Sequence, residues 1–587
     1  MTFKIKPLVS AVSLAVLLSA CGSDDESVRF ESLSLSVVGS HVSGNDFDTS
    51  SAEIVSYDKT TDKLYVVNAQ DQSVDVLTFN EQGEPEKQGS IDVSAAQTKA
   101  GITLGAANSV VAKNGLVAIA IENDHKQSDG VIALFNSGDL SFVNVYAAGA
   151  LPDMVTMTED GKMLVAANEG EPSGDYLNDP EGSVTIIDIS AGTGDEQAVV
   201  TQIDFNDFNA GQSRHSELDN VRLPAPHGAS VSQDLEPEYV AITSDNKAVI
   251  ALQENNAFAT INLDTKAVES IKGLGTKSWA SVADGGQGYQ LDLTNKDDEF
   301  TLNSYPQLVG YYMPDSIAAF TIDGEEYVIS ANEGDGREYI YEATKQACDD
   351  ADHDWDGDDA PAADELDDCI SYTDEGRGKD LDVAADHPLM NESIYGVDGT
   401  IANKNAIGRI KVLMDNDTIA ANENVPTFGA RSFSIWNAQG EQVFDSGSML
   451  SEIANTTSHF NTSNDGQEND NRSDDKGVEP EAIEVAVING ATIAFVGLER
   501  HGGIAAFDVS KPEAPVFLDY INNRDFSADV CTAVDDGECD NDTYNPAVGD
   551  LGPESIEYFS REDGHYIAVG NEVSGTTTVF DLNVVNQ

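Results

Sequence analysis

The chain has 587 residues, and its 104 Asp and Glu residues outnumber its 31 Lys and Arg residues, so the formal net charge is −73 at pH 7. Hydrophobic residues make up 40% of the sequence, which is enough to form a sizeable core. Such an acidic surface repels nucleic acid and anionic lipid, which excludes a nucleic-acid-binding protein. It suits divalent cations or a salty environment, and composition does not separate these two.

The N-terminal segment has the features of an export signal. Lys4 and Lys6 precede an apolar run at residues 8–18, which is well under the roughly 20 residues needed to span a bilayer. The run ends in Leu18-Ser19-Ala20-Cys21, which resembles a bacterial lipobox. We therefore expect a signal peptide at residues 1–20 and a lipid on Cys21; the alternative is an ordinary secretory signal with a chance cysteine.

Two further features of the sequence bear on localisation. Gly22 is not an aspartate, which favours an outer-membrane lipoprotein on the periplasmic or cell-surface face. No later segment is apolar enough to span a bilayer, so the lipid is the expected membrane anchor. Four cysteines remain after Cys21, and an even count in an exported chain indicates disulfides. Of three possible pairings we favour Cys348–Cys369 and Cys531–Cys539, because each closes a short loop.

One tetrapeptide, Pro-[Asp/Glu]-x-[Val/Ile], recurs five times along the chain. Each copy is followed by a strand, a polar turn and a second apolar strand that ends in another acid. The first acids are Asp153, Glu238, Asp315, Glu481 and Glu554, and the second acids are Glu169, Glu254, Glu333, Glu499 and Glu572. The offset between the two acids is 16 residues in the first two copies and 18 in the other three, so the pair recurs with nearly fixed geometry.

The repeats predict the fold class. Two weaker copies lie upstream, at Ala52-Glu53-Ile54-Val55 and Asn108-Ser109-Val110-Val111, which makes seven units. A third strand follows in each unit, and sustained helical periodicity is missing. Units of three or four antiparallel strands predict an all-β fold, a seven-bladed β-propeller over residues 47–587. We expect a tether at residues 21–46, with an early strand at residues 33–38.

The regular pattern is interrupted between Gly334 and Gly408 by an acidic stretch that holds the first cysteine pair. We interpret residues 335–407 as a disulfide-stapled insertion in the fifth blade, with strand signals resuming at residues 410–413. Within it, Asp352, Asp354 and Asp356 match the first half of an EF-hand-type calcium loop, with Gly357 at the sixth position. The match weakens at the twelfth position, Ala363, and an unstructured acidic loop is the alternative.

The paired acids predict a metal site. In a propeller the first strand of each blade lines the central channel, and the two acids of a hairpin lie at the same end. A closed ring would therefore gather at least ten carboxylates at one mouth. Like charges at that density need a partner, and Ca²⁺ accepts six to eight oxygen ligands in loose geometry. The alternative is that each acid caps a turn or accepts hydrogen bonds from a neighbouring blade.

Arg337, Arg472 and Arg500 fall near these acids in a chain that is poor in arginine. Guanidinium groups beside a metal can bind a phosphate bidentately; alternatively they are counter-charges that relieve the repulsion between carboxylates. Sequence motifs of hydrolases with a nucleophilic serine, of zinc proteases and of nucleotide-binding loops are missing. Catalytic residues are therefore unassigned.

Several of these motifs resemble those of the bacterial choice-of-anchor I family. The resemblance covers residues 45–585 and is carried by segments such as Asn168-Glu169-Gly170-Glu171, Asp234-Leu235-Glu236-Pro237-Glu238, Gly497-Leu498-Glu499-Arg500-His501 and Gly552-Pro553-Glu554. That family is similar to the mesenchyme-specific cell-surface glycoproteins of echinoderms, and some of its relatives are labelled alkaline phosphatase. The resemblance implies an exported surface propeller, in which Ca²⁺ would bind at the centre. It does not allow a catalytic residue to be assigned in this sequence.

Two functions follow as hypotheses. The first is a calcium-binding propeller that acts as a monomeric binding or scaffold module at the surface. The second is a calcium-dependent phosphoesterase at the same mouth, in which the metal would polarise a phosphoryl oxygen of a phosphorylated small molecule and the arginines would neutralise it. The sequence identifies no substrate and no protein partner.

Overall fold

A computed structural model describes residues 30–45, 47–297, 299–358, 361–464, 469–535, 538–539 and 544–586 of the protein. The predicted signal peptide and Cys21 lie outside these residues. The regular secondary structure of the described part is mainly β-strand, which confirms the predicted all-β class. Its α-helices are short: α1 (Ser94–Ala100), α2 (Val231–Asp234), α3 (Lys345–Ala351), α4 (Glu392–Tyr395) and α5 (Met449–Ala454).

Seven four-stranded antiparallel sheets follow one another along the described chain, and we number them 1 to 7. Sheets 1 to 4 are each made of four consecutive strands. Sheet 1 contains β2 (Val55–Asp58), β3 (Lys63–Asn68), β4 (Ser73–Phe79) and β5 (Pro85–Ile91); sheet 2 contains β6 (Leu104–Lys113), β7 (Leu116–Asn123), β8 (Asp129–Asn136) and β9 (Phe142–Ala150). Sheet 3 contains β10 (Pro152–Met157), β11 (Met163–Asn168), β12 (Ser183–Asp188) and β13 (Val199–Asp204); sheet 4 contains β14 (Val240–Ile242), β15 (Lys247–Leu252), β16 (Ala257–Asn262) and β17 (Ala267–Gly273).

Sheets 5 and 7 depart from this simple order. Sheet 5 contains β20 (Ile317–Ile322), β21 (Glu325–Asn332), β30 (Ser432–Asn437) and β31 (Gln442–Asp445), so about a hundred residues separate its second and third strands. Sheet 6 contains β32 (Pro480–Ile488), β33 (Ala491–Leu498), β34 (Ile504–Asp508) and β35 (Val516–Ile521). Sheet 7 joins the two ends of the chain, in the order β1 (Phe30–Val42), β40 (Thr576–Asn586), β39 (Gly564–Asn571) and β38 (Pro553–Arg561).

Local sequence explains the hairpins that start several sheets. The first two strands of sheets 2, 5 and 6 are joined at Asn114-Gly115, Asp323-Gly324 and Asn489-Gly490, and all six residues have positive φ. A two-residue hairpin with positive φ at both positions matches the twist of the flanking strands, and Asn-Gly or Asp-Gly adopts it at little cost. The strands themselves are rich in Val and Ile, and the second and third strands of most sheets are buried on both faces.

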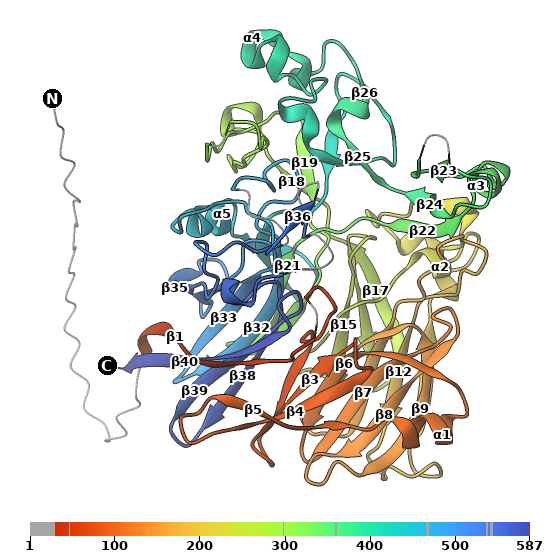
Figure 1. Ribbon diagram of the computed structural model, residues 1–587, viewed down its shortest axis with the longest axis vertical. Helices are drawn as coiled ribbons and strands as arrows, with labels where there is room; N and C mark the ends of the chain where they lie inside the picture. Colours follow the sequence, from red (N-terminus) through yellow and green to blue (C-terminus); the bar gives the residue numbers. More distant parts are fainter. Residues whose placement is uncertain are drawn as a thin grey trace.

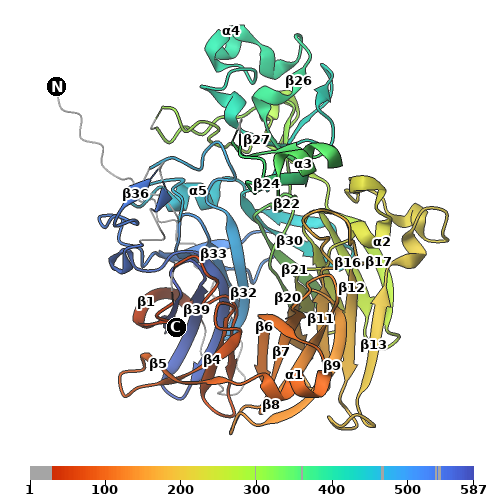
Figure 2. The same cartoon turned by 45° about the vertical axis from the view of Figure 1, so that its right-hand side comes forward.

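The sheets close into a ring because each packs face to face on the next. A buried apolar cluster lies between sheets 1 and 2, and similar clusters lie between every following pair through sheets 6 and 7. A further cluster, which includes Leu64 and Val66 of sheet 1 and Phe559 and Val579 of sheet 7, completes the circle. This closed ring of twisted sheets is a β-propeller architecture, and it occupies the lower part of Figures 1 and 2.

The N-terminal strand belongs to the ring and not to the tether. The strand expected at residues 33–38 is present and longer, because β1 pairs with β40 from Phe30↔Asn586 to Val42↔Thr576. Leu33 and Leu35 alternate with polar residues and pack with Phe580 and Leu582 in the core between sheets 6 and 7. Residues 30–42 of the predicted tether therefore belong to the ring, whereas residues 21–29 lie outside the described part of the chain.

A smaller unit interrupts sheet 5. It spans residues 333–431 and so continues beyond the predicted end at residue 407, because the strand at residues 411–413 pairs within the insertion and not with sheet 5. Its strands are β22 (Glu338–Ala343), β23 (Asp354–Trp355), β24 (Asp367–Thr373), β25 (Glu375–Arg377), β26 (Asp382–Val383), β27 (Lys411–Leu413), β28 (Thr418–Ile419) and β29 (Val425–Thr427). The predicted Cys348–Cys369 disulfide is confirmed within it.

The segment that links sheets 4 and 5 joins this unit. Its strands β18 (Thr276–Ser278) and β19 (Leu308–Tyr311) form a three-stranded sheet with β29. Trp279 and Leu308 from this segment share a separate buried core with Leu389, Ile410 and Val412 of the insertion. The two segments form the upper part of the molecule in Figures 1 and 2, at one end of the ring.

The remaining strands are β36 (Val534–Asp535) and β37 (Glu538–Cys539), which form a two-stranded hairpin before sheet 7. Cys531 is disulfide-bonded. The side chain of Cys539 lies outside the described part of the chain, so the Cys531–Cys539 pairing stays a prediction.

If β1 closes the ring, its buried side chains should carry stability that its exposed side chains do not. Leu33→Ala removes a side chain that is 3% exposed, and we expect the free energy of unfolding to fall by about 2–5 kcal/mol. Val37→Ala, on the same strand but 41% exposed, should change it by about 0.5 kcal/mol. Denaturant unfolding measures both, and equal losses would contradict the assignment of β1 to the core.

Candidate functional site

The acids that follow each repeated proline are aimed by the backbone. In sheets 3, 5 and 6 the residue before the proline has a left-handed conformation, with φ of 47° at Leu151, 44° at Met313 and 51° at Glu479. Non-glycine residues rarely adopt this conformation, and Gly552 takes the same place in sheet 7 at 69°. The pairing register of the inner strand then shifts, between Pro152 and Val155, Pro480 and Ile483, and Pro553 and Ser555. Such bulges re-aim side chains, here towards the centre of the ring.

The result is a strongly acidic cavity at one mouth of the ring. Its volume is about 450 Å³, and its lining includes eight carboxylates and one ammonium group, that of Lys126. Four of the predicted first acids and one predicted second acid are among them. The eight are Glu53, Glu122, Asp153, Glu169, Glu171, Glu238, Asp315 and Glu554.

The other predicted acids adjoin this cavity. Oxygen atoms of Asp315, Glu333 and Glu481 lie within 4.8 Å of one another, as do those of Glu333, Glu479 and Glu499. Glu254 raises the pKa of Glu238, and Glu572 raises that of Glu554, in each case after the larger effect of burial. The structure thus brings all ten acids of the repeats to one mouth.

Burial, together with the charges of neighbouring acids, raises the pKa of many of these groups above the usual carboxyl range. Burial raises the pKa of Glu53 to about 8, helped by the charges of Glu572 and Asp153. Burial and the charge of Glu122 raise the pKa of Asp153 to about 7. Burial and the charge of Glu236 raise the pKa of Glu254 to about 8. A bound cation would stabilise the charged forms and reverse these shifts.

Several carboxylate oxygens of the mouth also lack hydrogen-bond partners. Glu481 and Glu499 are 8% and 3% exposed, and the Oε2 atom of each is buried without a partner. The same holds for Oε2 of Glu53, Glu238 and Glu254. Buried polar atoms are normally satisfied, so these oxygens are free to accept an ion or its water shell.

Lys476 divides the mouth into two unlike halves. Its Nζ atom lies 2.6 Å from Glu333 Oε1, 3.0 Å from Asp335 Oδ1 and 3.3 Å from Glu479 Oε2, where a cation ligated by these acids would otherwise lie. Burial alone would raise the pKa of Glu479, but the charges of Arg472, Lys476 and Arg500 outweigh it and lower the pKa. We call this side, with its own counter-charges, the lysine half, and the side lined by the eight carboxylates the cavity half.

The three predicted phosphate-binding arginines are all paired with carboxylates. Arg337 is buried; its Nε donates to Glu236 Oε2 at 2.8 Å, and its Nη1 lies 3.3 Å from Asp234 Oδ1. Arg472 donates twice to Glu479 Oε1, at 2.6 and 3.0 Å. The Nε atom of Arg500 lies 3.0 Å from Glu499 Oε1. These contacts fit the counter-charge role that the sequence left open.

The acidic loop of the insertion is built differently. Asp352 ends α3 in a left-handed conformation, Asp354 lies in β23, and the side chains of Asp352, Asp354 and Asp356 are exposed. None of them belongs to the groups of converging ligand atoms among the described residues. Calcium binding by this loop stays a prediction.

The mouth includes residues that the repeat analysis did not assign to it. Glu53 and Glu122 belong to the two weaker copies, at the positions of a first and a second acid, so the repeat itself carried the signal. Glu171 follows Glu169 by two residues, and Glu479 directly precedes the fourth of the five repeated prolines. Nothing in the sequence near Lys476 indicates its role, because its partner Glu333 is 143 residues away.

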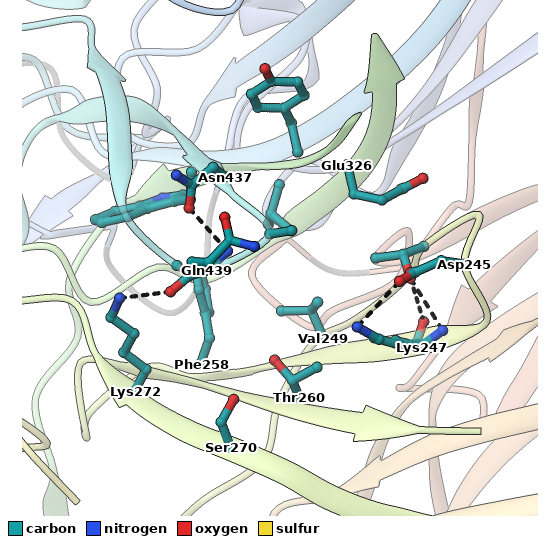
Figure 3. A pocket seen from close by; sticks show the side chains of 16 residues that line it. Asp245, Lys247, Val249, Phe258, Thr260, Ser270, Lys272, Glu326, Asn437 and Gln439 are labelled. Carbon is teal, nitrogen blue, oxygen red and sulfur yellow. Dashed lines mark hydrogen bonds and ion pairs between the residues drawn. The ribbon is translucent and has the colours of Figure 1, made fainter. Parts of the chain in front are cut away.

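A second hollow lies on the outside of the ring between sheets 4 and 5 (Figure 3). At about 100 Å³ it is less than a quarter the size of the mouth cavity. Phe258 and Trp436 are among the apolar side chains that line it, while Lys272 donates to the Gln439 carbonyl at 2.6 Å and Lys247 pairs with Asp245 at 3.2 Å. Since its charged groups already have hydrogen-bond or ion-pair partners, the mouth is the stronger candidate site.

Comparison with protein families identifies the chain. The model of the choice-of-anchor I domain matches residues 53–512, most of the chain, and the match begins at the first acid of the mouth. The chain belongs to the choice-of-anchor I family. The match includes both halves of the mouth apart from Glu554 and Glu572, which lie beyond its end in sheet 7.

Other similarities are more distant. A mesenchyme-specific cell surface glycoprotein of Strongylocentrotus purpuratus is 27% identical over 157 residues, which cover 25% of this chain and 19% of that protein. The chain thus matches about a fifth of the length of that relative.

Among solved structures, the hydrazine synthase of Kuenenia stuttgartiensis has a TM-score of 0.39 at 11% identity and covers 93% of this chain and 99% of its own. The β-propeller domain of Cps50 (Swd1) from Myceliophteria thermophila has a TM-score of 0.38 at 6% identity, with coverages of 92% and 99%. A streptogramin B lyase has a TM-score of 0.37 at 8% identity, with coverages of 93% and 97%.

The raised pKa values predict how the stability of the metal-free protein depends on pH. The unfolded chain releases these protons near the ordinary value of 4.5 for Glu, whereas folded Glu53, Glu254 and Asp153 keep them to about pH 7–8. The folded state binds more protons in this window, so the free energy of unfolding should fall as pH rises through it. Melting temperatures from pH 5 to 8 at fixed ionic strength measure this; a rise with pH would contradict it.

The buried contacts of Lys476 in the lysine half lead to a second prediction, on the free energy of unfolding. Lys476→Met leaves Glu333, Asp335 and Glu479 with one cation fewer in a buried site, and we expect a loss of about 3–5 kcal/mol of unfolding free energy. Lys162→Met breaks an exposed pair with Asp160, which solvent screens, so its effect on the free energy of unfolding should be much smaller. Denaturant unfolding compares the two, and losses of similar size would show that Lys476 is not a required counter-charge.

Proposed function

We propose that the protein is an exported, lipid-anchored surface module that binds Ca²⁺ at the acidic mouth of a seven-bladed β-propeller. The seven sheets are its blades, and the disulfide-bonded unit between β21 and β30 is an insertion in the fifth. The observation that carries the calcium proposal is the cavity half, in which eight carboxylates face one lysine and several buried oxygens lack a partner.

The geometry supports Ca²⁺ more than a smaller ion. The ligand atoms are carboxylate oxygens from several separate sheets, so their spacing is set by the ring and not by one compact loop. Ca²⁺ tolerates irregular sets of six to eight oxygens, whereas Mg²⁺ requires a near-ideal octahedron with short bonds. The cavity also has room for water molecules to complete the coordination.

The lysine half is a less suitable place for the ion, although its carboxylates lie closest together. Lys476, Arg472 and Arg500 already neutralise Glu333, Glu479 and Glu499, and an added divalent ion would be repelled by these cations at short range. Binding is therefore expected among Asp153, Glu238, Asp315 and their neighbours in the cavity half.

The expected location at the cell surface agrees with a role as a calcium-binding surface module. The lipobox-like Leu18-Ser19-Ala20-Cys21 would supply the anchor, and the choice-of-anchor I family is surface-associated. None of the helices among the described residues combines the length and the apolarity needed to cross a bilayer. We place the protein on the outer membrane, as a monomer, with Ca²⁺ as a structural ion.

A calcium-dependent phosphoesterase is the alternative, favoured by the closeness of Arg472 and Arg500 to the mouth. Both already donate to Glu479 or Glu499, so a phosphate would have to displace a carboxylate from each. A binding or scaffold role needs no such rearrangement. Turnover of a generic phosphomonoester by the soluble domain with added Ca²⁺ would favour the enzyme.

The calcium proposal is tested with Glu238→Gln. Burial and neighbouring acids raise the pKa of Glu238, which costs stability near neutral pH, and Gln removes this cost, so the metal-free variant should melt higher than the metal-free wild type. Ca²⁺ at a hundredfold excess over its dissociation constant should stabilise the wild type by about 2.7 kcal/mol, and Mg²⁺ by less. The variant should lose most of this gain. Calorimetry with and without each ion, at fixed ionic strength, measures the effect.

The matched control replaces Asp352, Asp354 and Asp356 of the insertion loop with Asn. This variant should keep most of the stabilisation by Ca²⁺. If the control loses the effect and Glu238→Gln keeps it, the ion binds in the loop. If the wild type melts identically in chelator and in Ca²⁺, the carboxylates are structural and the proposal fails.

A further inference from the structure

One side chain of the cavity half differs in charge from all the acids around it. Among the described residues that line the cavity, Lys126 supplies the one ammonium group beside eight carboxylates. It lies in the turn between β7 and β8, four residues after Glu122, the second acid of sheet 2. Its Nζ atom lies 3.7 Å from Glu122 Oε2. Lys126 is therefore the counter-charge that the chain itself supplies to this half of the mouth.

The backbone of the turn is fixed at the rim of the cavity. The His125 backbone N–H donates to Asn123 Oδ1 at 3.1 Å, which closes the turn after β7. The Gln127 side chain donates from Nε2 to the Glu171 carbonyl at 3.4 Å, which joins the turn to the loop after β11 of sheet 3. Position 126 is thus held between two sheets whose acids line the cavity.

The side chain of Lys126 is held much less firmly than its backbone. It is 57% exposed, and its contact with Glu122 is long for an ion pair. Lys476 of the lysine half, by contrast, is 4% exposed and lies 2.6 Å from Glu333 Oε1. An exposed ion pair contributes little free energy, whereas a buried one is costly to break. Another cation can therefore displace Lys126 from its carboxylates far more easily than Lys476.

The charge of Lys126 acts on the same acids that are expected to bind the ion. Burial raises the pKa of Glu171 to about 7, the charge of Glu236 adds to this rise, and the charge of Lys126 opposes it. Burial and the charge of Glu122, the partner of Lys126, raise the pKa of Asp153 to about 7. An ion bound by Asp153 and its neighbours would thus lie within the short-range field of the ammonium group.

We propose that Lys126 is a tethered competitor of Ca²⁺, which occupies the acidic cavity when no ion is bound and is displaced when Ca²⁺ enters. The proposal rests on calcium binding in the cavity half. Both cations are attracted to the same carboxylates, and they repel each other at short range. The apparent affinity for Ca²⁺ is lowered because only the molecules in which Lys126 has left the cavity are ready to bind.

This competition would set the range of calcium concentration to which the mouth responds. The carboxylates alone would bind the ion more tightly and stay occupied at lower concentrations. With the lysine in place, the site fills and empties at a higher concentration. Lys126 would thus adjust the affinity of the mouth, whereas Lys476 is a permanent counter-charge.

The test is a calorimetric titration of the full chain with Ca²⁺ at fixed ionic strength. Lys126→Met keeps an unbranched side chain and removes the charge, so we expect the dissociation constant to fall about tenfold. Lys126→Arg keeps the charge and should stay within about twofold of the wild type.

Lys162→Met is the matched control. Lys162 is 58% exposed, close to the value for Lys126, and its replacement changes the net charge by the same amount. It lies in the turn between β10 and β11, at the end of sheet 3 opposite the pair Pro152↔Asn168 near the mouth. This variant should bind Ca²⁺ like the wild type. An equal fall in its dissociation constant would show that net charge, and not the position of Lys126, sets the affinity.

A second measurement needs no variant and covers the case in which Lys126→Met does not fold. Ca²⁺ should increase the rate at which a small acylating reagent modifies Lys126 in the wild type, because the amine leaves its carboxylates. The rate at Lys162 should not change. Mass spectrometry of the peptides measures both rates, and an unchanged or slower reaction at Lys126 in the presence of Ca²⁺ would overturn the proposal.

Calcium binding and the role of Lys126 fail in different ways. If Ca²⁺ binds neither the wild type nor Lys126→Met, the calcium proposal itself is wrong. If Ca²⁺ binds both with the same dissociation constant, calcium binding holds and Lys126 is not a competitor.

Discussion

Repulsion between carboxylates at the mouth is the constraint on which the rest of the molecule depends. The ring of sheets brings the acid of each inner strand to a common centre, and at these distances the charges cannot all be present without compensation. The protein compensates in two ways. On one side the chain itself supplies Lys476, Arg472 and Arg500 as counter-charges. On the other side burial and neighbouring carboxylates raise the pKa of Glu53 and Glu254 to about 8, so these groups keep their protons. A divalent ion would replace those protons. The charge state of the cavity half therefore depends on the pH and on the concentration of such ions around the protein.

The backbone accepts strain to maintain this arrangement. Left-handed residues precede the prolines of sheets 3, 5, 6 and 7, and the register shifts after the prolines of sheets 3, 6 and 7. Because tightly packed apolar clusters fix each sheet against the next, the side chains at the mouth cannot spread apart to reduce their repulsion. The hydrophobic core thus holds the acids together at a free-energy cost that packing offsets.

Whether the sequence predicts a feature depends on how far apart along the chain the interacting residues lie. The ten acids of the repeats were predictable because proline, acid and strand lie within a few residues of one another, and repetition implies a ring. Glu53 and Glu122 were visible only as weak copies. The alternation of Leu33 and Leu35 indicated a strand, but its partner lies at the other end of the chain, so the sequence placed it in a tether. Lys476 could not be assigned, because its contacts join the segment before sheet 6 to the end of sheet 5 across the insertion.

The union of the two chain ends in sheet 7 has a consequence for biogenesis. β40 is made more than 500 residues after β1, and until then the core between sheets 6 and 7 and the last inter-sheet contact with sheet 1 have no partner. An incomplete chain therefore cannot close its ring, because sheet 7 and the two apolar clusters that flank it lack their last strands. Ring closure is thus a late step of folding that follows the synthesis of β40.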